Sequence, residues 1–226
     1  QRGLTANGPS LMRMLITTGP TREYFDSVRF LSNASTGKMG CAVAQEASRR
    51  GHAVVLICGP LRATVPDGVE VIHVVTAGEM FDAAVQRFEE CHAAVMTAAV
   101  CDYRPASREP VKMKKQASVR RVELLPTADI CHHLGTIKGD RVLVGFALED
   151  RDSRARAEEK MRRKRCDAMV LNAVETLGAD EATVEILRAG TGWQPARQGT
   201  KAQIAADLVD LVESLRGDSG QIPKSG

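Results

Sequence analysis

Hydroxyl, amide and basic side chains gather in one stretch between an apolar run that predicts a buried strand and an alanine-rich segment that predicts a helix. Such a loop presents free backbone N–H groups and the positive end of the helix dipole, which together bind phosphate or carboxylate. An ordinary helix cap in a Ser/Asn/Gly-rich loop is the alternative. The donors and cations of this stretch are Arg22, Arg29, Ser32, Asn33, Ser35, Thr36 and Lys38.

A carboxylate and a group of lysines follow a second apolar run in the middle of the chain. Asp102 comes just after the run 93–100, where one carboxylate can bind Mg²⁺ while substrate phosphates complete the ligand shell. Lys112, Lys114 and Lys115 form a cationic cluster of the kind that stabilises a triphosphate. From spacing alone, a turn-capping aspartate and a solvated loop are the alternatives.

Two further basic positions lie on one face of a predicted helix. Lys160 and Lys164 are one helical turn apart, so their ammonium groups can reach the same anion, with an exposed helix face as the alternative. The adjacent pair His132 and His133 is a poor metal site, because neighbouring helical side chains point about 100° apart. We therefore assign no role to the five histidines.

The elements that would position these residues alternate between buried strands and amphipathic helices. The first part of the chain reads β-α-β-β-α-β, which predicts a largely parallel sheet in an α/β domain. Ligands bind such sheets at the carboxyl ends of the strands, where the 19–40 loop and the residues after Val100 would lie. Strands are predicted at 13–18, 53–58, 69–75, 93–100, 142–147, 166–171 and 183–188, and helices at 38–50, 77–90, 127–134 (capped by Thr127), 153–164 and 200–216.

The segment 103–125 departs from this pattern. It is interrupted by proline, basic at its start, and alternates only over Val119 to Leu124, where we predict a strand. A lone strand between polar residues is a poor core element but can pair with a second copy of the chain, so we predict a mobile arm that forms a homodimer. We expect a flexible leader at 1–12, one α/β domain at 13–216 and a flexible tail at 217–226.

Composition narrows the class of protein. Hydrophobic residues make up 43% of the chain and charged residues 26%, and the net charge of +3 is too small to predict nucleic-acid binding. The six cysteines include no Cys-x-x-Cys pair, so we expect reduced core thiols in a cytoplasmic protein. No apolar run approaches the ~20 residues of a membrane span, so we expect no membrane partner. Neither Gly-x-Gly-x-x-Gly nor a P-loop occurs at the first turn, which counts against an NAD(P)-dependent oxidoreductase.

Several short motifs follow one another in a fixed order. The first is Ser-Asn-Ala-Ser-Thr-Gly-Lys-Met-Gly at 32–40, preceded by Thr-Arg-Glu at 21–23. The others are Ala-Ala-Val-Cys-Asp-Tyr-Arg at 98–104, Lys-Met-Lys-Lys at 112–115, Ala-Asp-Ile at 128–130, Val-Gly-Phe-Ala at 144–147, and Lys160 with Lys164. Together they resemble the phosphopantothenoylcysteine synthetase (phosphopantothenate–cysteine ligase) family of coenzyme A biosynthesis, over nearly all of residues 13–216.

The resemblance implies a three-layer Rossmann-like or ribokinase-like fold, with a mainly parallel sheet, helices on both faces and a β-arm for dimerisation. It implies a ligase that joins 4′-phosphopantothenate to L-cysteine through an acyl-nucleotide and releases pyrophosphate and a nucleoside monophosphate. Mg²⁺ would accompany the triphosphate, which is CTP in bacterial relatives and ATP in eukaryotic ones. We favour CTP. A flavin-dependent decarboxylase, fused in many bacterial relatives, is an expected partner.

By the same resemblance, Asn33 would polarise the acyl-nucleotide carbonyl for amine attack, Lys112 would act on the triphosphate, and Asp102 would bind Mg²⁺. Phosphopantothenate would contact Arg29, Asn33, Ser35, Ala98 and Ala99. The nucleotide would contact Met96, Thr97, Ala98, Asp102, Lys112, Ala128, Asp129, Ile130, Cys131, Phe146, Lys160 and Lys164. Cys101 and Ala128 depart from the family's Ala and Pro, which leaves the choice of nucleotide open. A non-catalytic nucleotide-binding relative is the alternative; the retained Asn33, Asp102 and Lys112 count against it.

Overall fold

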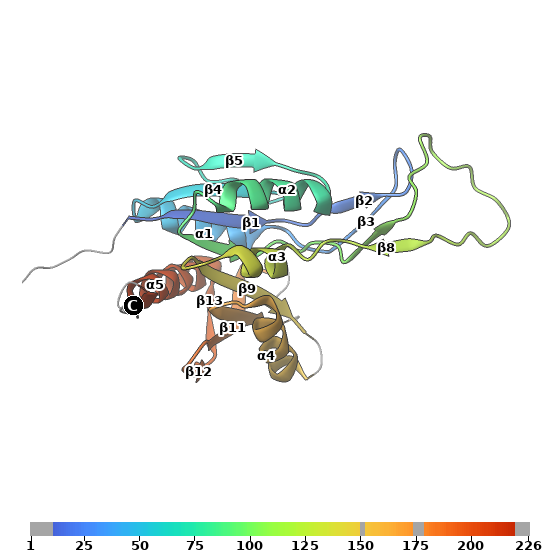
Figure 1. Cartoon of the computed structure of the whole chain (residues 1–226). Helices are drawn as coiled ribbons and strands as arrows, with labels where there is room; N and C mark the ends of the chain where they lie inside the picture. Colours follow the sequence, from blue (N-terminus) through green and yellow to red (C-terminus); the bar gives the residue numbers. More distant parts are fainter. Residues whose placement is uncertain (1–10, 150–151, 174–178, 220–226) are drawn as a thin grey trace, which may run out of the picture.

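A nine-stranded sheet forms the centre of the computed structural model, which describes residues 11–149, 152–173 and 179–219 (Figure 1). Six neighbouring strands, in the order β5-β4-β1-β6-β9-β10, are all parallel. β4 pairs with one edge of β1 and β6 pairs with the other, so the chain adds strands outward in both directions from β1. Their bounds are β1 Arg13–Thr18, β4 Ala53–Cys58, β5 Glu70–His73, β6 Ala93–Met96, β9 Val142–Leu148 and β10 Ala168–Asn172.

Antiparallel strands extend the sheet beyond β10. The long strand β11 pairs with β10, and the short strands β12 and β13 pair with β11. The predicted strand at 183–188 is therefore part of a longer element close to the sheet edge. The bounds are β11 Glu181–Arg188, β12 Gly192–Trp193 and β13 Arg197–Thr200.

Helices cover both faces of the sheet, which confirms the predicted α/β class. On one face α1 and α5 pack together, and on the other α3 contacts both α2 and α4. Because both faces are covered, consecutive residues of β1 are all buried: Met14 and Ile16 join one core cluster and Leu15 the other. The bounds are α1 Lys38–Arg49, α2 Ala77–Phe88, α3 Ile130–Ile137, α4 Ser153–Lys164 and α5 Lys201–Ser219.

Two small two-stranded sheets form an arm outside this core. One pairs β2 (Arg22–Tyr24) with β3 (Phe30–Ser32), and the other pairs β7 (Tyr103–Pro105) with β8 (Leu124–Pro126). Figure 1 shows them extending from one end of the body, with the loop before β8 reaching furthest.

The predicted strand at Val119 to Leu124 is wrong, because strand structure begins only at Leu124. Among the described residues, no strand pairs with 119–123, and Val119 is 89% exposed. The predicted start of the helix at Thr127 is also wrong. Asp129 is the N-cap of α3, while the Thr127 hydroxyl donates to the Cys101 carbonyl.

The ends of the chain lie largely outside the described residues, including 1–10 of the predicted leader and 220–226 of the predicted tail. Within the described part, Met12 is already buried and α5 continues to Ser219. None of the helices described is both long and apolar enough to cross a membrane.

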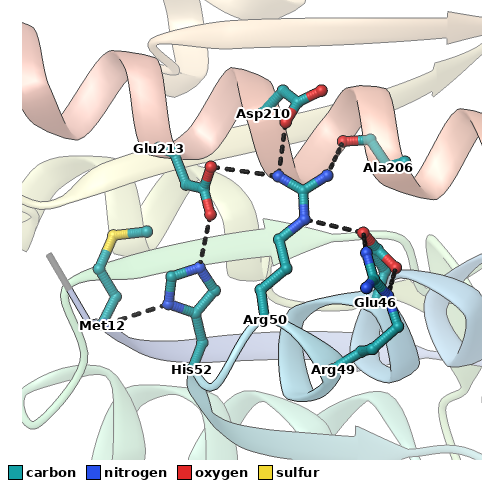
Figure 2. Close-up of polar contacts among 8 residues, drawn as sticks. All are labelled: Met12, Glu46, Arg49, Arg50, His52, Ala206, Asp210 and Glu213. Atoms are coloured by element: carbon teal, nitrogen blue, oxygen red, sulfur yellow. Dashed lines mark hydrogen bonds and ion pairs between the residues drawn. The ribbon is translucent and has the colours of Figure 1, made fainter. Parts of the chain in front are cut away.

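A polar network joins α1 to α5 at the amino ends of the parallel strands (Figure 2). Arg50 Nη1 donates to Asp210 at 2.5 Å and to Glu213 at 3.1 Å, and its Nε donates to Glu46 at 2.7 Å. His52 bonds Glu213 at 2.9 Å through Nε2 and accepts the Met12 backbone N–H at Nδ1. The network therefore fixes the entry of the chain into β1.

Candidate active site

A cavity of about 580 Å³ opens at the carboxyl ends of β1, β6 and β9 and is called the main cavity below. It lies at the point where the sheet winds in opposite directions from neighbouring strands, which is the usual ligand site of such sheets. Most of the positions proposed from the sequence line it. These are Asn33, Ser35, Met96, Ala98, Ala99, Asp102, Ala128, Asp129, Ile130, Cys131, Phe146, Lys160 and Lys164.

A smaller cavity of about 150 Å³ adjoins it and shares Ser35, Ala98 and Phe146 with it. Thr97 lines this small cavity and not the main one. The sequence analysis did not single out Asn172 and Lys201, which come from β10 and α5 and also line it. Nothing in their local sequence marks them, since only the sheet order brings these elements beside the 35–40 loop.

The remaining predicted positions, Arg29 and Lys112, lie at and beside the β2–β3 turn of the arm and do not line either cavity. Arg29 bonds Asp26 and the Met113 carbonyl, so it holds the segment that carries Lys112, whose side chain is exposed. Arg163, which lines the main cavity, was also missed in the sequence, although its place between Lys160 and Lys164 was a usable signal.

The loops after β1 and β6 are fastened to each other, which fixes the rim of the main cavity. The Ala99 N–H donates to the Gly19 carbonyl at 2.9 Å, and the Thr21 N–H donates to the Ala99 carbonyl at 3.4 Å. The Thr21 hydroxyl accepts the Cys101 N–H at 2.9 Å. Two loops that are about 80 residues apart in sequence therefore act as one surface.

Asn33 is oriented by this surface. Its side-chain amide donates to the Ala99 carbonyl at 3.1 Å and to the Val100 carbonyl at 3.0 Å. Both N–H groups of the amide are therefore engaged. The amide oxygen remains able to accept a hydrogen bond from a ligand. If Asn33 is to donate to a developing oxyanion, as predicted, one of these two bonds must be released first.

The start of α1 has the free donors expected of an anion site. Gly37 is its N-cap at φ 79°, a left-handed conformation that favours glycine, and it provides no side-chain cap. The Gly37 carbonyl accepts the Thr18 hydroxyl at 2.9 Å, which fixes the loop on β1. The backbone N–H groups of this first turn border the small cavity, next to Lys38 and Ser35.

The opposite wall of the main cavity is built by Asp129 and the end of α4. Asp129 accepts the His132 N–H at 3.0 Å, Lys164 Nζ at 3.0 Å and, more weakly, Arg163 at 3.6 Å. Burial opposes its ionisation, but these bonds and charges outweigh burial and lower the pKa of Asp129. Lys160 is paired with Glu149, so both helix lysines predicted for the nucleotide face the cavity in ion pairs.

Asp102 presents an exposed carboxylate to the main cavity, while its backbone carbonyl accepts the Thr127 N–H at 2.9 Å. Across the described residues, no cluster of three or more His, Cys, Asp or Glu could hold a metal by itself. A single carboxylate fits Mg²⁺ that arrives with a nucleotide, because the phosphates supply the other ligands.

A buried carboxylate ties the segment between β7 and β8 to the β2–β3 turn. Asp26 accepts the backbone N–H groups of Arg29 (2.6 Å), Val28 (2.7 Å) and Met113 (3.2 Å). Burial favours its neutral form, but these hydrogen bonds and the Arg29 charge prevail, and the pKa of Asp26 is lowered. Asp26 thus fixes the segment next to Lys112.

The neighbouring histidines have separate partners. His132 Nδ1 bonds the Arg163 carbonyl at 2.9 Å, and the ring of His133 lies 4.9 Å from that of Phe81, centroid to centroid. The two side chains therefore take part in packing around α3 and serve different neighbours.

Known proteins resemble this chain closely in sequence and fold. The coenzyme A biosynthesis bifunctional protein CoaBC of Bacillus subtilis is 42% identical over 213 residues, which are 92% of this chain and 52% of that protein. A prokaryotic cysteine/cysteine sulfinic acid decarboxylase is 38% identical over 210 residues, 90% of this chain and 58% of that protein. The chain thus spans about half the length of these curated relatives.

Among solved structures, the C-terminal domain of a CoaBC bifunctional protein superposes with a TM-score of 0.79 and 33% identity, covering 93% of this chain and 100% of that one. The family described as the DNA/pantothenate metabolism flavoprotein C-terminal domain matches residues 10–215. The chain therefore belongs to this family, the phosphopantothenoylcysteine synthetase part of the CoaBC proteins.

Proposed function

We propose that the chain is a ligase that joins 4′-phosphopantothenate to L-cysteine, with CTP activating the carboxylate as an acyl-cytidylate. The observation that carries the proposal is the convergence of Asn33, Asp102 and Lys164 on one cavity, from the loop before α1, the segment between β6 and β7, and the end of α4. Activation brings an anionic carboxylate to a polyanion, so the site must supply cations and fixed donors. Pyrophosphate and CMP are the other products.

The nucleotide would occupy the main cavity. Phe146 gives an apolar wall, and the N-terminus of α3 with Lys160 and Lys164 faces the phosphates. Each lysine would exchange its carboxylate partner, Glu149 or Asp129, for a phosphate oxygen. Mg²⁺, held by Asp102 and the phosphates, would neutralise the charge that develops on the triphosphate.

Phosphopantothenate would bind beside the start of α1. The uncapped N–H groups there, with Ser35 and Lys38, suit an anionic group, and the small cavity leads from them to the rim at Ala99. Arg29 would act from the β2–β3 turn of the arm. The carboxylate to be activated then lies between the two cavities, which share Ser35, Ala98 and Ala99.

Amide formation would follow when the cysteine amine attacks the acyl carbonyl and CMP leaves. Asn33 would donate one N–H to the carbonyl oxygen as it becomes negative, giving up its bond to Ala99 or Val100. The fixed backbone carbonyls keep the side chain at the rim throughout.

The arm would complete the site in a homodimer. Its described part exposes several apolar side chains, including Val111 (68%), Val119 (89%) and Leu124 (43%), and this surface can pair with a second copy. Closure of the arm would bring Lys112 over the nucleotide and exclude water. Light scattering should give a dimer, and limited proteolysis at Lys114 and Lys115 should slow when CTP is added; a fully active monomer would contradict the dimer.

The function is tested by pyrophosphate release with each substrate omitted in turn. Release should require CTP, Mg²⁺ and phosphopantothenate in the first turnover, and cysteine only for further turnovers. ATP in place of CTP should support less release. Release that is independent of phosphopantothenate would contradict the proposal.

The bifunctional relatives also suggest a flavin-dependent decarboxylase as a fused or separate partner, which co-purification would test.

A further inference from the structure

Two buried thiols meet in the wall of the main cavity. Cys131 Sγ and Cys166 Sγ are 3.5 Å apart, and among the described residues no other two thiols are in hydrogen-bond contact. Cys131 is the second residue of α3, and Cys166 lies between α4 and β10. A disulfide needs a separation of about 2.05 Å, so a small approach of the two segments would close the bond.

The fold brings the two segments together through a glycine. A Cβ on Gly135, one turn after Cys131 in α3, would lie 1.9 Å from the Lys164 carbonyl oxygen. Any other residue would therefore push α3 away from the end of α4. The ion pair of Asp129 with Lys164 joins the same two segments beside the thiols.

The two buried cysteines border different cavities. Cys131 lines the main cavity, whereas Cys166 lines a separate surface cavity with Lys138 and Arg165. The hydrogen bond from Cys166 lowers the pKa of Cys131, burial opposes this, and the Lys164 ammonium adds to the lowering. Cys131 borders the main cavity and has the lowered pKa, so it is the better nucleophile of the two.

We infer that Cys131 and Cys166 form a peroxide-reactive dithiol that closes reversibly into a disulfide in the wall of the main cavity. The Cys131 thiolate attacks a peroxide oxygen, the O–O bond breaks, and water leaves after taking up a proton, which gives a sulfenic acid. Cys166 then attacks the Cys131 sulfur, the S–O bond breaks, and the departing hydroxide takes the Cys166 proton. Two thiols and one hydrogen peroxide thus give one disulfide and two waters.

Hydrogen peroxide treatment followed by mass spectrometry tests the inference directly. The intact protein should lose two hydrogens, the digest should contain one peptide pair linked through Cys131 and Cys166, and dithiothreitol should reverse both changes. In Cys166→Ser, dimedone should label Cys131 as a trapped sulfenic acid. A protein that keeps six free thiols, or links another pair, would overturn the inference.

Cys101→Ser is the matched control, because Cys101 is equally buried, its thiol donates to the Thr21 carbonyl, and burial raises its pKa. This variant should form the 131–166 link at the parent's rate; loss of the link would overturn the inference. One further measurement in this experiment rests on the proposed function. CTP in the main cavity should slow oxidation at least fivefold, and a link that forms without such protection would count against the nucleotide site and leave the dithiol standing.

Discussion

The two ends of the parallel sheet hold basic side chains in different surroundings. At the amino ends, Arg50 and His52 are almost enclosed, and each bonds more than one group (Figure 2). At the carboxyl ends, Lys160 and Lys164 are also paired, but each of them faces an open cavity with room for a ligand.

This difference separates stabilising charges from charges that can bind. In the amino-end network the Arg50 guanidinium donates to three carboxylates and the Ala206 carbonyl, so it has little capacity for a ligand. In the cavity, Lys164 holds one carboxylate, and its partner Asp129 keeps 36% of its side chain exposed. A phosphate can replace such a partner, because the exchange leaves no buried charge unpaired.

The largest effect should follow removal of a cavity cation. Lys164→Ala should raise the Kd for CTP by about 30-fold, or about 2 kcal/mol, with a small change in stability. Lys138→Ala is the control, since it breaks a similar lysine–aspartate pair, with Asp167 at 2.5 Å, outside the main cavity. Calorimetric titration checks both, and equal losses of CTP affinity would remove the distinction between the two ends.

The reverse experiment removes the centre of the amino-end network. Arg50→Ala should lower the free energy of unfolding by about 2 kcal/mol, because three carboxylates lose their shared partner. The variant should bind CTP as the parent does. Arg49→Ala should cost clearly less stability than Arg50→Ala, since Arg49 is exposed and, among the described residues, bonds only Glu46. Urea unfolding measures both, and a weakened CTP affinity in Arg50→Ala would count against the comparison.

A smaller loss should follow a change at the proposed metal contact. Asp102→Asn should weaken CTP binding about tenfold in Mg²⁺ and very little in EDTA, because only the metal-dependent part is lost. Asp82→Asn, at an exposed position of α2, should have no effect in either buffer. Calorimetric titration with CTP in each buffer measures the affinities. Circular dichroism should show that the variants fold as the parent does. Equal affinity of Asp102→Asn and the parent in Mg²⁺ would make Asp102 a turn residue only.

The smallest effect concerns acid stability at the amino-end network. The hydrogen bond from Arg49 and, against burial, that from Arg50 lower the pKa of Glu46 from 4.5 to about 2. A lowered folded-state pKa contributes stability above pH 4.5 that is lost as the pH falls toward 2. Glu46→Gln should therefore be less stable at neutral pH and show a shallower fall of Tm in that window. Parallel Tm curves for parent and variant would contradict this.

Local patterns were enough to predict most strands, most helices and the edge of the sheet that carries the site. Asn33, Asp102 and Lys164 could be placed at one end of the sheet because parallel strands present their carboxyl ends together. Composition also marked 103–125 as an arm, but the register of β8 depends on pairing with β7 and is absent from the local alternation.

Contacts between distant segments could not be predicted. The Asn33 amide meets the carbonyls of Ala99 and Val100 only after the loops of β1 and β6 join. The Met113 backbone N–H bonds Asp26, 87 residues away in the sequence. Cys131 contacts Cys166 because Gly135 has no side chain to keep α3 away from the end of α4. These contacts depend on how whole strands and helices pack against one another. A short stretch of sequence carries no information about that packing.

A single turnover of Asn33→Asp tests the central claim most directly, because it separates activation from amide formation at one cavity. Rapid quench with labelled CTP, phosphopantothenate and cysteine should show a burst of pyrophosphate comparable to the parent's, an accumulated acyl-cytidylate, and amide formation slowed at least 100-fold, a loss of about 3 kcal/mol or more. Amide formation at the parent's rate would contradict the role of Asn33, and the absence of any pyrophosphate burst from the parent enzyme would contradict the ligase itself.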